Sequence, residues 1–282
     1  MLHGVKTLAG VEKRPVCGYN PHREVRRMDP RPVGFFDSGL GGISVLGEAL
    51  RVLPNENFIY FGDTLHIPYG DKPPREVLRY SRDAVRLLLD QGCKAIVIAC
   101  NTATSVAAAQ LRAELSLPII GMEPALKPAS LLPGDGKVLV MATRNTLALP
   151  KFQSLMERFG RDAIPLPCSG LMECVEAGEL SGERVEALLE QLTAPYRSEN
   201  IKAVVLGCTH YPFLKKTIAK FFPAGTALID GNLGTVRQLG RRLQEEGLAN
   251  CGPGGQITFL SSMEGGEPIR QMQQMLARWK NA

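Results

Sequence analysis

Short apolar runs alternate with amphipathic segments along most of the chain. Four of these runs predict strands, at residues 33–36, 57–61, 95–99 and 118–121. Three segments have the apolar spacing of helices, at residues 43–53, 76–91 and 102–115. The run at 95–99 is apolar throughout, which is typical of a strand buried on both faces of a parallel sheet. Strands and helices that alternate in this way predict a parallel α/β fold.

The same pattern begins again in the second half of the chain, with apolar runs at 137–141 and 203–206. Residues 94–102 (KAIVIACNT) are echoed by residues 202–210 (KAVVLGCTH), at an offset of 108 residues. An earlier pair of strand-to-loop segments keeps nearly the same offset, 105 residues. The repeat predicts two similar α/β halves, and chance similarity between buried strands is the alternative.

We therefore expect an α/β protein with two similar lobes, each built on a parallel β-sheet flanked by helices. Residues 32–126 together with 235–282 are predicted to form the first lobe. Residues 127–234 are predicted to form the second lobe, inserted into the first. Because ligands bind at the carboxyl ends of parallel strands, two lobes that face each other would share one active site in the cleft between them.

The composition is that of a globular protein, and an excess of basic residues distinguishes the first 31 residues from the rest of the chain. The chain has 282 residues, 44% hydrophobic and 22% charged, which is ordinary for a globular enzyme of one or two domains. The net charge is +5, and residues 1–31 hold seven basic against three acidic side chains. We expect this basic N-terminal extension to be flexible, and we do not expect nucleic acid to be a partner. A basic arm that touches nucleic acid is the alternative for residues 1–31, whose role stays open.

The sequence predicts a cytoplasmic protein with free thiols. No apolar run reaches the length of about 18 residues that a membrane helix needs, and no secretory signal is recognisable at the N-terminus. The seven cysteines are an odd number and include no C-x-x-C spacing. That usage favours a reducing compartment over a disulfide framework or a structural zinc site.

Two of the cysteines, Cys100 and Cys208, directly follow buried strands and precede polar loops. If the halves face each other, the two thiols approach one ligand from opposite sides. Inversion of a carbon centre requires removal of a proton on one face and delivery of a proton on the other. Thiols suit this task because their pKa of about 8.5 is readily shifted by neighbours. The other cysteines are expected to be structural, because free cysteine is commonly buried: Cys17, Cys93, Cys168, Cys174 and Cys251.

Groups that could assist the thiols lie beside them or near a strand end. The hydroxyls of Thr102, Thr104 and Thr209, with backbone N–H groups at the following helix N-termini, could stabilise a thiolate. Asp37 and His210, one in each half, could accept or relay protons.

Five motifs then identify a family resemblance that covers roughly residues 32–275. They are Asp37-Ser38-Gly39-Leu40-Gly41-Gly42, Pro68-Tyr69-Gly70, Ala99-Cys100-Asn101-Thr102-Ala103, Glu123-Pro124 and Gly207-Cys208-Thr209-His210-Tyr211-Pro212. In order and spacing they resemble the motifs of glutamate racemases, within the aspartate/glutamate racemase family. Aspartate racemases share the two cysteines but usually place an acid where this chain has His210.

The resemblance implies interconversion of L- and D-glutamate without a cofactor or a metal, and supply of D-glutamate for peptidoglycan synthesis. It implies that Cys100 and Cys208 are the two bases and that Asp37 and His210 assist them. It further implies a set of substrate-binding residues: Asp37, Ser38, Tyr69, Gly70, Asn101, Thr102, Thr209 and His210. Homodimers are common in the family, although no interface can be read from this sequence.

The chain departs from the family pattern at a few positions. His66 stands where an arginine is more usual, and Asp230-Gly231 stands where Asp-Ser is common. We expect these changes to affect loop contacts and affinity rather than the reaction. Glu176 lies near the position of a family glutamate, so a role in the site and a solvated helix position both stay open.

Two other functions are weighed against a racemase. The glycines at 39, 41 and 42, with Asp63 at the end of the second strand, approximate a dinucleotide-binding fingerprint. Ser44 does not fit that fingerprint, and Asp37 would repel a pyrophosphate. The second alternative is a non-catalytic two-lobed binding protein whose basic extension docks on DNA, with salt-dependent DNA retention as its test.

Overall fold

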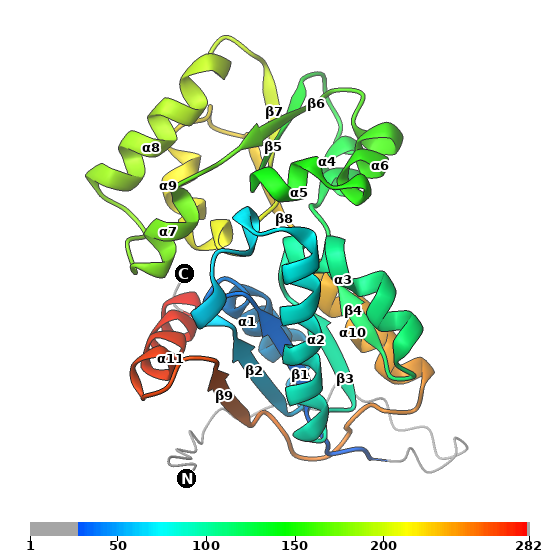
Figure 1. The fold of residues 1–282 in the computed structure, drawn as a ribbon. Helices are drawn as coiled ribbons and strands as arrows, with labels where there is room; N and C mark the ends of the chain where they lie inside the picture. The colour runs from blue at the N-terminus through cyan, green and yellow to red at the C-terminus, as the bar shows by residue number, and fades with distance from the viewer. Residues whose placement is uncertain (1–27, 281–282) are drawn as a thin grey trace.

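A computed structural model describes residues 28–280 and shows two α/β lobes (Figure 1). All neighbouring strands are parallel in both sheets. The first sheet has the order β4 (Ile119–Gly121), β3 (Ala95–Ile98), β1 (Val33–Asp37), β2 (Phe58–Gly62) and β9 (Ile257–Ser261). The second sheet has the order β6 (Ala163–Pro167), β5 (Lys137–Ala142), β7 (Ile201–Leu206) and β8 (Ala227–Asp230).

The helices divide between the lobes as Figure 1 shows. Around the first sheet lie α1 (Ile43–Val52), α2 (Pro74–Asp90), α3 (Asn101–Glu114), α10 (Asn232–Glu245) and α11 (Glu267–Lys280). Around the second lie α4 (Leu126–Ser130), α5 (Arg144–Ala148), α6 (Pro150–Phe159), α7 (Leu171–Glu176), α8 (Glu183–Thr193) and α9 (Lys215–Ala219). Short 3-10 turns include η1 (Thr64–His66), η2 (Tyr69–Asp71), η3 (Ala194–Tyr196) and η4 (Tyr211–Leu214). Over residues 28–280, no helix has the length and apolar character needed to cross a membrane.

The first sheet is covered on both faces because side chains alternate along its strands. Phe35 of β1 packs in the cluster that contains α1, α10 and α11, whereas its neighbour Phe36 packs in the cluster with α2 and α3. The central strands β1 and β3 are buried along their whole length. This burial on both faces is the reason that their sequences are continuous apolar runs.

The repeat predicted from the sequence is present in the strand order. In the first lobe the strands run β4-β3-β1-β2, and in the second the same places are taken by β8-β7-β5-β6. The first lobe adds β9 beside β2. Cys100 follows β3 and Cys208 follows β7, so the two cysteines occupy equivalent places in the two sheets. The two-lobed α/β fold is therefore confirmed.

Strands β6, β8 and β9 are absent from the sequence prediction, and all three lie at sheet edges. Their residues are mostly half-buried rather than fully buried, and β6 contains two prolines. Edge strands tolerate proline and need no continuous apolar run, so their sequence pattern is weak.

The chain passes to the second sheet after β4 and returns to the first sheet after β8. The lobe boundaries at 126/127 and 234/235 stay predictions, and α10, which packs on α1, begins at Asn232. The predicted flexibility of the N-terminal extension concerns residues 1–31, of which residues 1–27 lie outside the described residues.

Candidate active site

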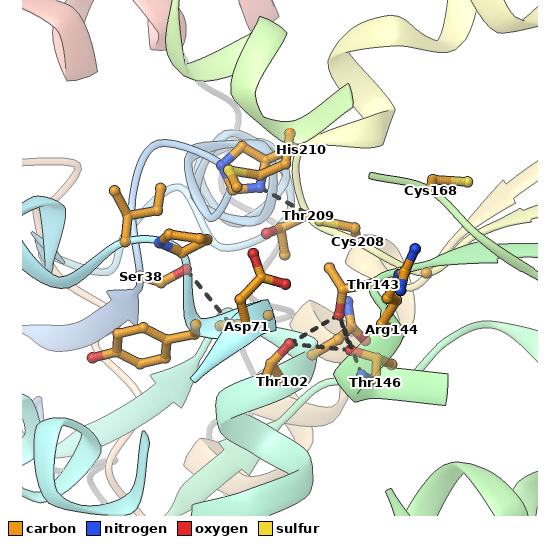
Figure 2. Close-up of a pocket in the computed structure, with 18 of the residues that line it drawn as sticks. Ser38, Asp71, Thr102, Thr143, Arg144, Thr146, Cys168, Cys208, Thr209 and His210 are labelled. Carbon is orange, nitrogen blue, oxygen red and sulfur yellow. Dashed lines mark hydrogen bonds between the residues drawn. The ribbon is translucent and has the colours of Figure 1, made fainter. Parts of the chain in front are cut away.

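A pocket lies where the carboxyl ends of the two sheets face each other (Figure 2). The first lobe contributes Ser38, Ile67, Pro68, Tyr69, Gly70, Asp71, Cys100, Asn101 and Thr102. The second lobe contributes Thr143, Arg144, Thr146, Cys168, Ser169, Met172, Glu173, Gly207, Cys208, Thr209 and His210. The catalytic and substrate-binding residues proposed from the sequence line this pocket except Asp37, which is fully buried next to Ser38. Thr104, proposed from the sequence to stabilise a thiolate, also lies outside the pocket lining, and its hydroxyl donates to Ile98 O at 3.1 Å.

On the first-lobe side, Cys100 follows β3 and caps the N-terminus of α3. Its Sγ accepts a hydrogen bond from Ala103 N at 3.5 Å and lies 3.8 Å from Ser38 Oγ. Burial raises the pKa of Cys100, and the negative charge of Asp37 raises it further. The surroundings of Cys100 therefore favour the neutral thiol.

Asp37 ends β1 and accepts hydrogen bonds from the backbone N–H groups of Ser38, at 2.8 Å, and Gly42. Thr209 Oγ1 of the other lobe donates to the same carboxylate at 3.5 Å. Burial raises the pKa of Asp37, although the positive charge of His210 opposes this shift. The carboxyl is thus a group that can hold a proton close to Cys100.

On the second-lobe side, His210 links the thiol to a carboxylate. Its Nδ1 lies 3.5 Å from Cys208 Sγ and its Nε2 lies 2.6 Å from Glu176 Oε1. Burial disfavours the charged ring, but the negative charges of Cys208 and Glu176 outweigh it and hold the pKa of His210 well above its usual range. A group that favours its charged form therefore lies directly beside the Cys208 sulfur.

Glu176, whose role stays open in the sequence, lies within this arrangement. It ends α7, and its Oε1 also accepts from Leu40 N of the first lobe at 2.7 Å. One carboxylate oxygen therefore contacts both the imidazole of His210 and the loop that follows Asp37.

The glycines of residues 39–42 let the second lobe approach this loop closely. A Cβ built on Gly41 would lie 2.5 Å from both His210 Nδ1 and Thr209 Oγ1. A Cβ on Gly39 would overlap the carboxylate of Glu176. Ser44 Oγ of α1 adds a further link between the lobes, donating to Thr209 O at 3.0 Å.

This geometry also argues against the dinucleotide-binding alternative. The backbone N–H groups of Ser38 and Gly42, which a phosphate would need, already donate to Asp37. Asp63, the candidate ribose ligand, accepts from the Tyr69 hydroxyl at 2.6 Å and lies 2.8 Å from His66 Nδ1.

Polar groups that can receive a ligand line the rest of the pocket. Asn101 is only 4% exposed, and neither polar atom of its side chain has a hydrogen-bond partner among the described residues. Thr102 Oγ1 lies 3.3 Å from Thr143 Oγ1 and 3.1 Å from Thr146 Oγ1, so three hydroxyls from two lobes meet (Figure 2). A buried amide without partners is costly unless a ligand or water satisfies it.

The structure refines the part that Tyr69 and Gly70 can play. Burial raises the pKa of Tyr69, and its hydroxyl is engaged by Asp63. Only the ring and backbone of Tyr69 are therefore free to face a ligand. Gly70 lies against Thr143 of the other lobe. A Cβ built on Gly70 would lie 3.1 Å from the Cβ of Thr143. His66 stacks on Tyr80, with ring centroids 4.0 Å apart, and does not line the pocket.

Several residues that line the pocket are absent from the sequence prediction. Thr143 and Thr146 follow β5, so the rule that ligands bind at the carboxyl ends of parallel strands, applied to this strand, would have identified them. Cys168, expected only to pack, also lines the pocket, and its Sγ donates to Leu166 O at 3.3 Å. Cys93 and Cys174 lie buried in the cores of the two lobes.

Two equivalent α/β lobes, each bringing a cysteine from a strand end to one shared pocket, define a two-lobed amino-acid racemase, an isomerase. A family model described as Asp/Glu/Hydantoin racemase matches residues 63–239. The chain belongs to the glutamate racemases of this family. It is 51% identical over 237 residues to the glutamate racemase of Clostridium perfringens (strain SM101 / Type A), which covers 83% of this chain and 91% of the relative.

Solved glutamate racemases have the same fold. The Escherichia coli enzyme, determined with L-glutamate and the activator UDP-MurNAc-ala, is 30% identical with a TM-score of 0.79. That match covers 89% of this chain and 96% of the other. The enzyme from Francisella tularensis subsp. tularensis SCHU S4, determined with D-glutamate, is 30% identical with a TM-score of 0.76 and coverages of 89% and 95%.

Proposed function

We propose that this protein interconverts L- and D-glutamate by a two-base mechanism in which Cys100 and Cys208 act on opposite faces of the α-carbon. The observation that carries the proposal is the placing of the two thiols at equivalent strand ends of facing lobes, both lining one pocket. Each thiol has a titratable neighbour of its own, Asp37 near Cys100 and His210 beside Cys208.

The reaction begins with Cys208 as the thiolate and Cys100 as the thiol. Imidazolium at His210 stabilises the first form, and burial together with Asp37 stabilises the second. The Cys208 thiolate removes the α-proton, and the electron pair left on the α-carbon is shared with the α-carboxylate. The Cys100 thiol then delivers its proton to the opposite face. The enzyme ends with Cys208 as the thiol and Cys100 as the thiolate, ready to act on the other enantiomer.

Hydrogen-bond donors in the pocket bind the substrate and stabilise the developing negative charge. The unpartnered amide of Asn101 and the hydroxyls of Ser38, Thr102 and Thr209 are placed to bind carboxylates. Tyr69 and Gly70 add pocket wall, and Asp37 and His210 act behind the thiols. Donors fixed in advance, in a site closed to water, lower the barrier most where charge develops.

Glutamate is the proposed substrate because relatives that share this fold were determined with L-glutamate and with D-glutamate. The two thiols supply both the acid and the base of the proposed reaction, so it needs neither pyridoxal phosphate nor a metal ion.

The same proposal gives the protein a place in the cell. A cytoplasmic enzyme of this kind would supply D-glutamate for peptidoglycan synthesis, as a homodimer that does not bind membranes or nucleic acid. Growth of a bacterial D-glutamate auxotroph on this chain, and lack of growth on the C208S variant, would test the biological part. Sedimentation equilibrium would test the dimer.

The reaction itself is tested by circular dichroism of reduced protein with L-glutamate or L-aspartate and no added cofactor. Decay of the signal to zero with glutamate alone supports the proposal. Decay with aspartate alone retains the mechanism but overturns the substrate, and decay with neither rejects the activity. In D₂O, replacement of the α-hydrogen in the product gives an independent readout of proton removal.

A further inference from the structure

The pocket carries few permanent charges, and they are unevenly distributed between its walls. Two exposed carboxylates line it: Asp71 from η2 in the first lobe and Glu173 from α7 in the second. Among the pocket-lining residues within 28–280, Arg144 is the only lysine or arginine. The Arg144 side chain is exposed and forms no ion pair with another described residue.

Arg144 is fixed at the edge of the cleft by the start of α5. Thr143 caps this helix, accepting from Thr146 N at 3.2 Å, and Arg144 is its first residue. Figure 2 shows Arg144 beside Thr143 and Thr146, whereas Asp71 comes from the opposite lobe. The guanidinium is thus an exposed cation next to the hydroxyl cluster of the pocket wall.

Glutamate at neutral pH carries two carboxylates and one ammonium, a net negative charge. Asp71 and Glu173 therefore oppose its entry into the pocket, whereas an unpaired guanidinium attracts it. Guanidinium matches a carboxylate in geometry as well as in charge, because its planar donors form two parallel hydrogen bonds. The buried hydrogen-bond donors of the pocket, Asn101, Thr102 and Thr209, are uncharged, so they do not supply this attraction.

We propose that Arg144 is a substrate-capture residue, which draws a carboxylate of the incoming amino acid past Asp71 and Glu173 and holds it at the pocket mouth. The inference rests on the proposed racemisation of glutamate and concerns binding alone. Arg144 takes no part in proton transfer, so its removal weakens binding of both enantiomers equally.

The test compares R144Q with R161Q, a matched loss of one positive charge on the same lobe. Arg161 is exposed and lies two residues before β6, at the amino ends of the strands and outside the pocket lining. We expect R144Q to raise KM about fivefold for both enantiomers, the factor for one solvated charge pair at about 4 Å. The kcat value should stay within about twofold, and R144K should restore only the part of the KM change that depends on charge.

Ionic strength supplies a second readout. From about 0.01 M to 0.15 M KCl the Debye length falls from about 30 to 8 Å, so kcat/KM of the wild-type protein should fall. In R144Q this dependence should vanish or reverse, because two repelling carboxylates remain. R161Q should keep the wild-type dependence.

Three outcomes would overturn the role of Arg144: an unchanged KM in R144Q, a salt dependence equal to that of R161Q, or a fall in kcat alone. Calorimetric titration of L-glutamate separates this inference from the proposed reaction. If the wild-type protein binds L-glutamate without racemising it, the reaction is rejected. The dissociation constants of wild type, R144Q and R161Q then still decide whether Arg144 captures the ligand.

Discussion

The two thiols of the pocket occupy equivalent places in the two lobes but have unlike neighbours. Cys100 follows β3 and lies near the buried carboxyl of Asp37, which favours the neutral thiol. Cys208 follows the equivalent strand β7 and lies 3.5 Å from His210, whose ring is held in its charged form. The repeated topology thus sets the positions of the two sulfurs, while residues from different loops place a carboxyl near one and an imidazole beside the other.

This difference suits a reaction that needs one acid and one base at the same moment. With identical surroundings the two sulfurs would have the same intrinsic pKa, and neither would be favoured as the acid or the base. The neighbours also connect the lobes, since Glu176 contacts both His210 and Leu40 N. One carboxylate therefore joins the first lobe to the imidazole that lies beside Cys208.

The largest effect on the two thiols is expected when each sulfur is removed in turn. We expect C100S and C208S each to lose racemisation by about 10³-fold or more, as for other residues that act as a unit. Each variant keeps one base, so each should exchange the α-proton of a single enantiomer, and the two variants should exchange opposite enantiomers. Proton NMR in D₂O measures this exchange.

Equal residual racemisation in C100S and C208S, or exchange of the same enantiomer by both, would contradict the two-base mechanism. The control is C93A, which changes a cysteine buried in the core of the first lobe, outside the pocket. It should retain the wild-type kcat.

Substitution of His210 and of Asp37 tests whether each of these groups assists only one of the two thiols. H210N should lower kcat about 10²-fold, the usual size of an acid–base contribution. The decrease in kcat should arise from slower proton transfer to and from Cys208. The primary deuterium isotope effect on kcat/KM should therefore rise for the enantiomer that C100S exchanges. D37N should raise the isotope effect for the other enantiomer.

Stopped-flow circular dichroism with α-deuterated L- and D-glutamate measures both isotope effects. H66N is the control, because His66 lies outside the pocket lining. Isotope effects that rise equally for both enantiomers in H210N would show that His210 does not serve one thiol in particular.

A smaller effect is expected from the contact between the lobes. G41A places a methyl group 2.5 Å from His210 Nδ1 and Thr209 Oγ1, so these side chains or the second lobe that carries them must shift. We expect kcat to fall about tenfold, a loss of about 1.4 kcal/mol in transition-state stabilisation. G234A is the matched control, because nothing lies within 4 Å of a Cβ there and alanine favours the helix. Equal kcat values in the two variants would contradict this role of Gly41.

The smallest expected effect is a pH-dependent difference in stability. The pKa of His210 is raised on folding, so its contribution is full below the unfolded value of about 6.5 and is lost as pH rises through the folded pKa. Urea unfolding should therefore show H210N less stable than wild type at pH 6, by about 1–3 kcal/mol. The difference should shrink toward pH 10, and a difference that grows with pH would contradict the charged state of His210.

The sequence predicted a strand most clearly where the strand is buried on both faces. The inner strands β1, β3, β5 and β7 appear as apolar runs because both faces of a central strand are covered. The edge strands β6, β8 and β9 give no comparable signal, since their side chains are only half-buried. The 108-residue offset between Cys100 and Cys208, nearly repeated by an earlier pair of segments, predicted two similar lobes.

The sequence by itself determined which residues we propose for the chemistry and the strand ends on which they lie. Cys100, Cys208, Asp37 and His210 follow from strand ends and local motifs, because strand formation depends on neighbouring residues. The tertiary structure alone placed Glu176 against His210 and Leu40, joined Thr102 to Thr143 and Thr146, and left Arg144 at the pocket edge. These contacts join distant parts of the chain across two lobes, and no local preference encodes how two rigid lobes dock. The packing of the lobes decides which side chains share the pocket.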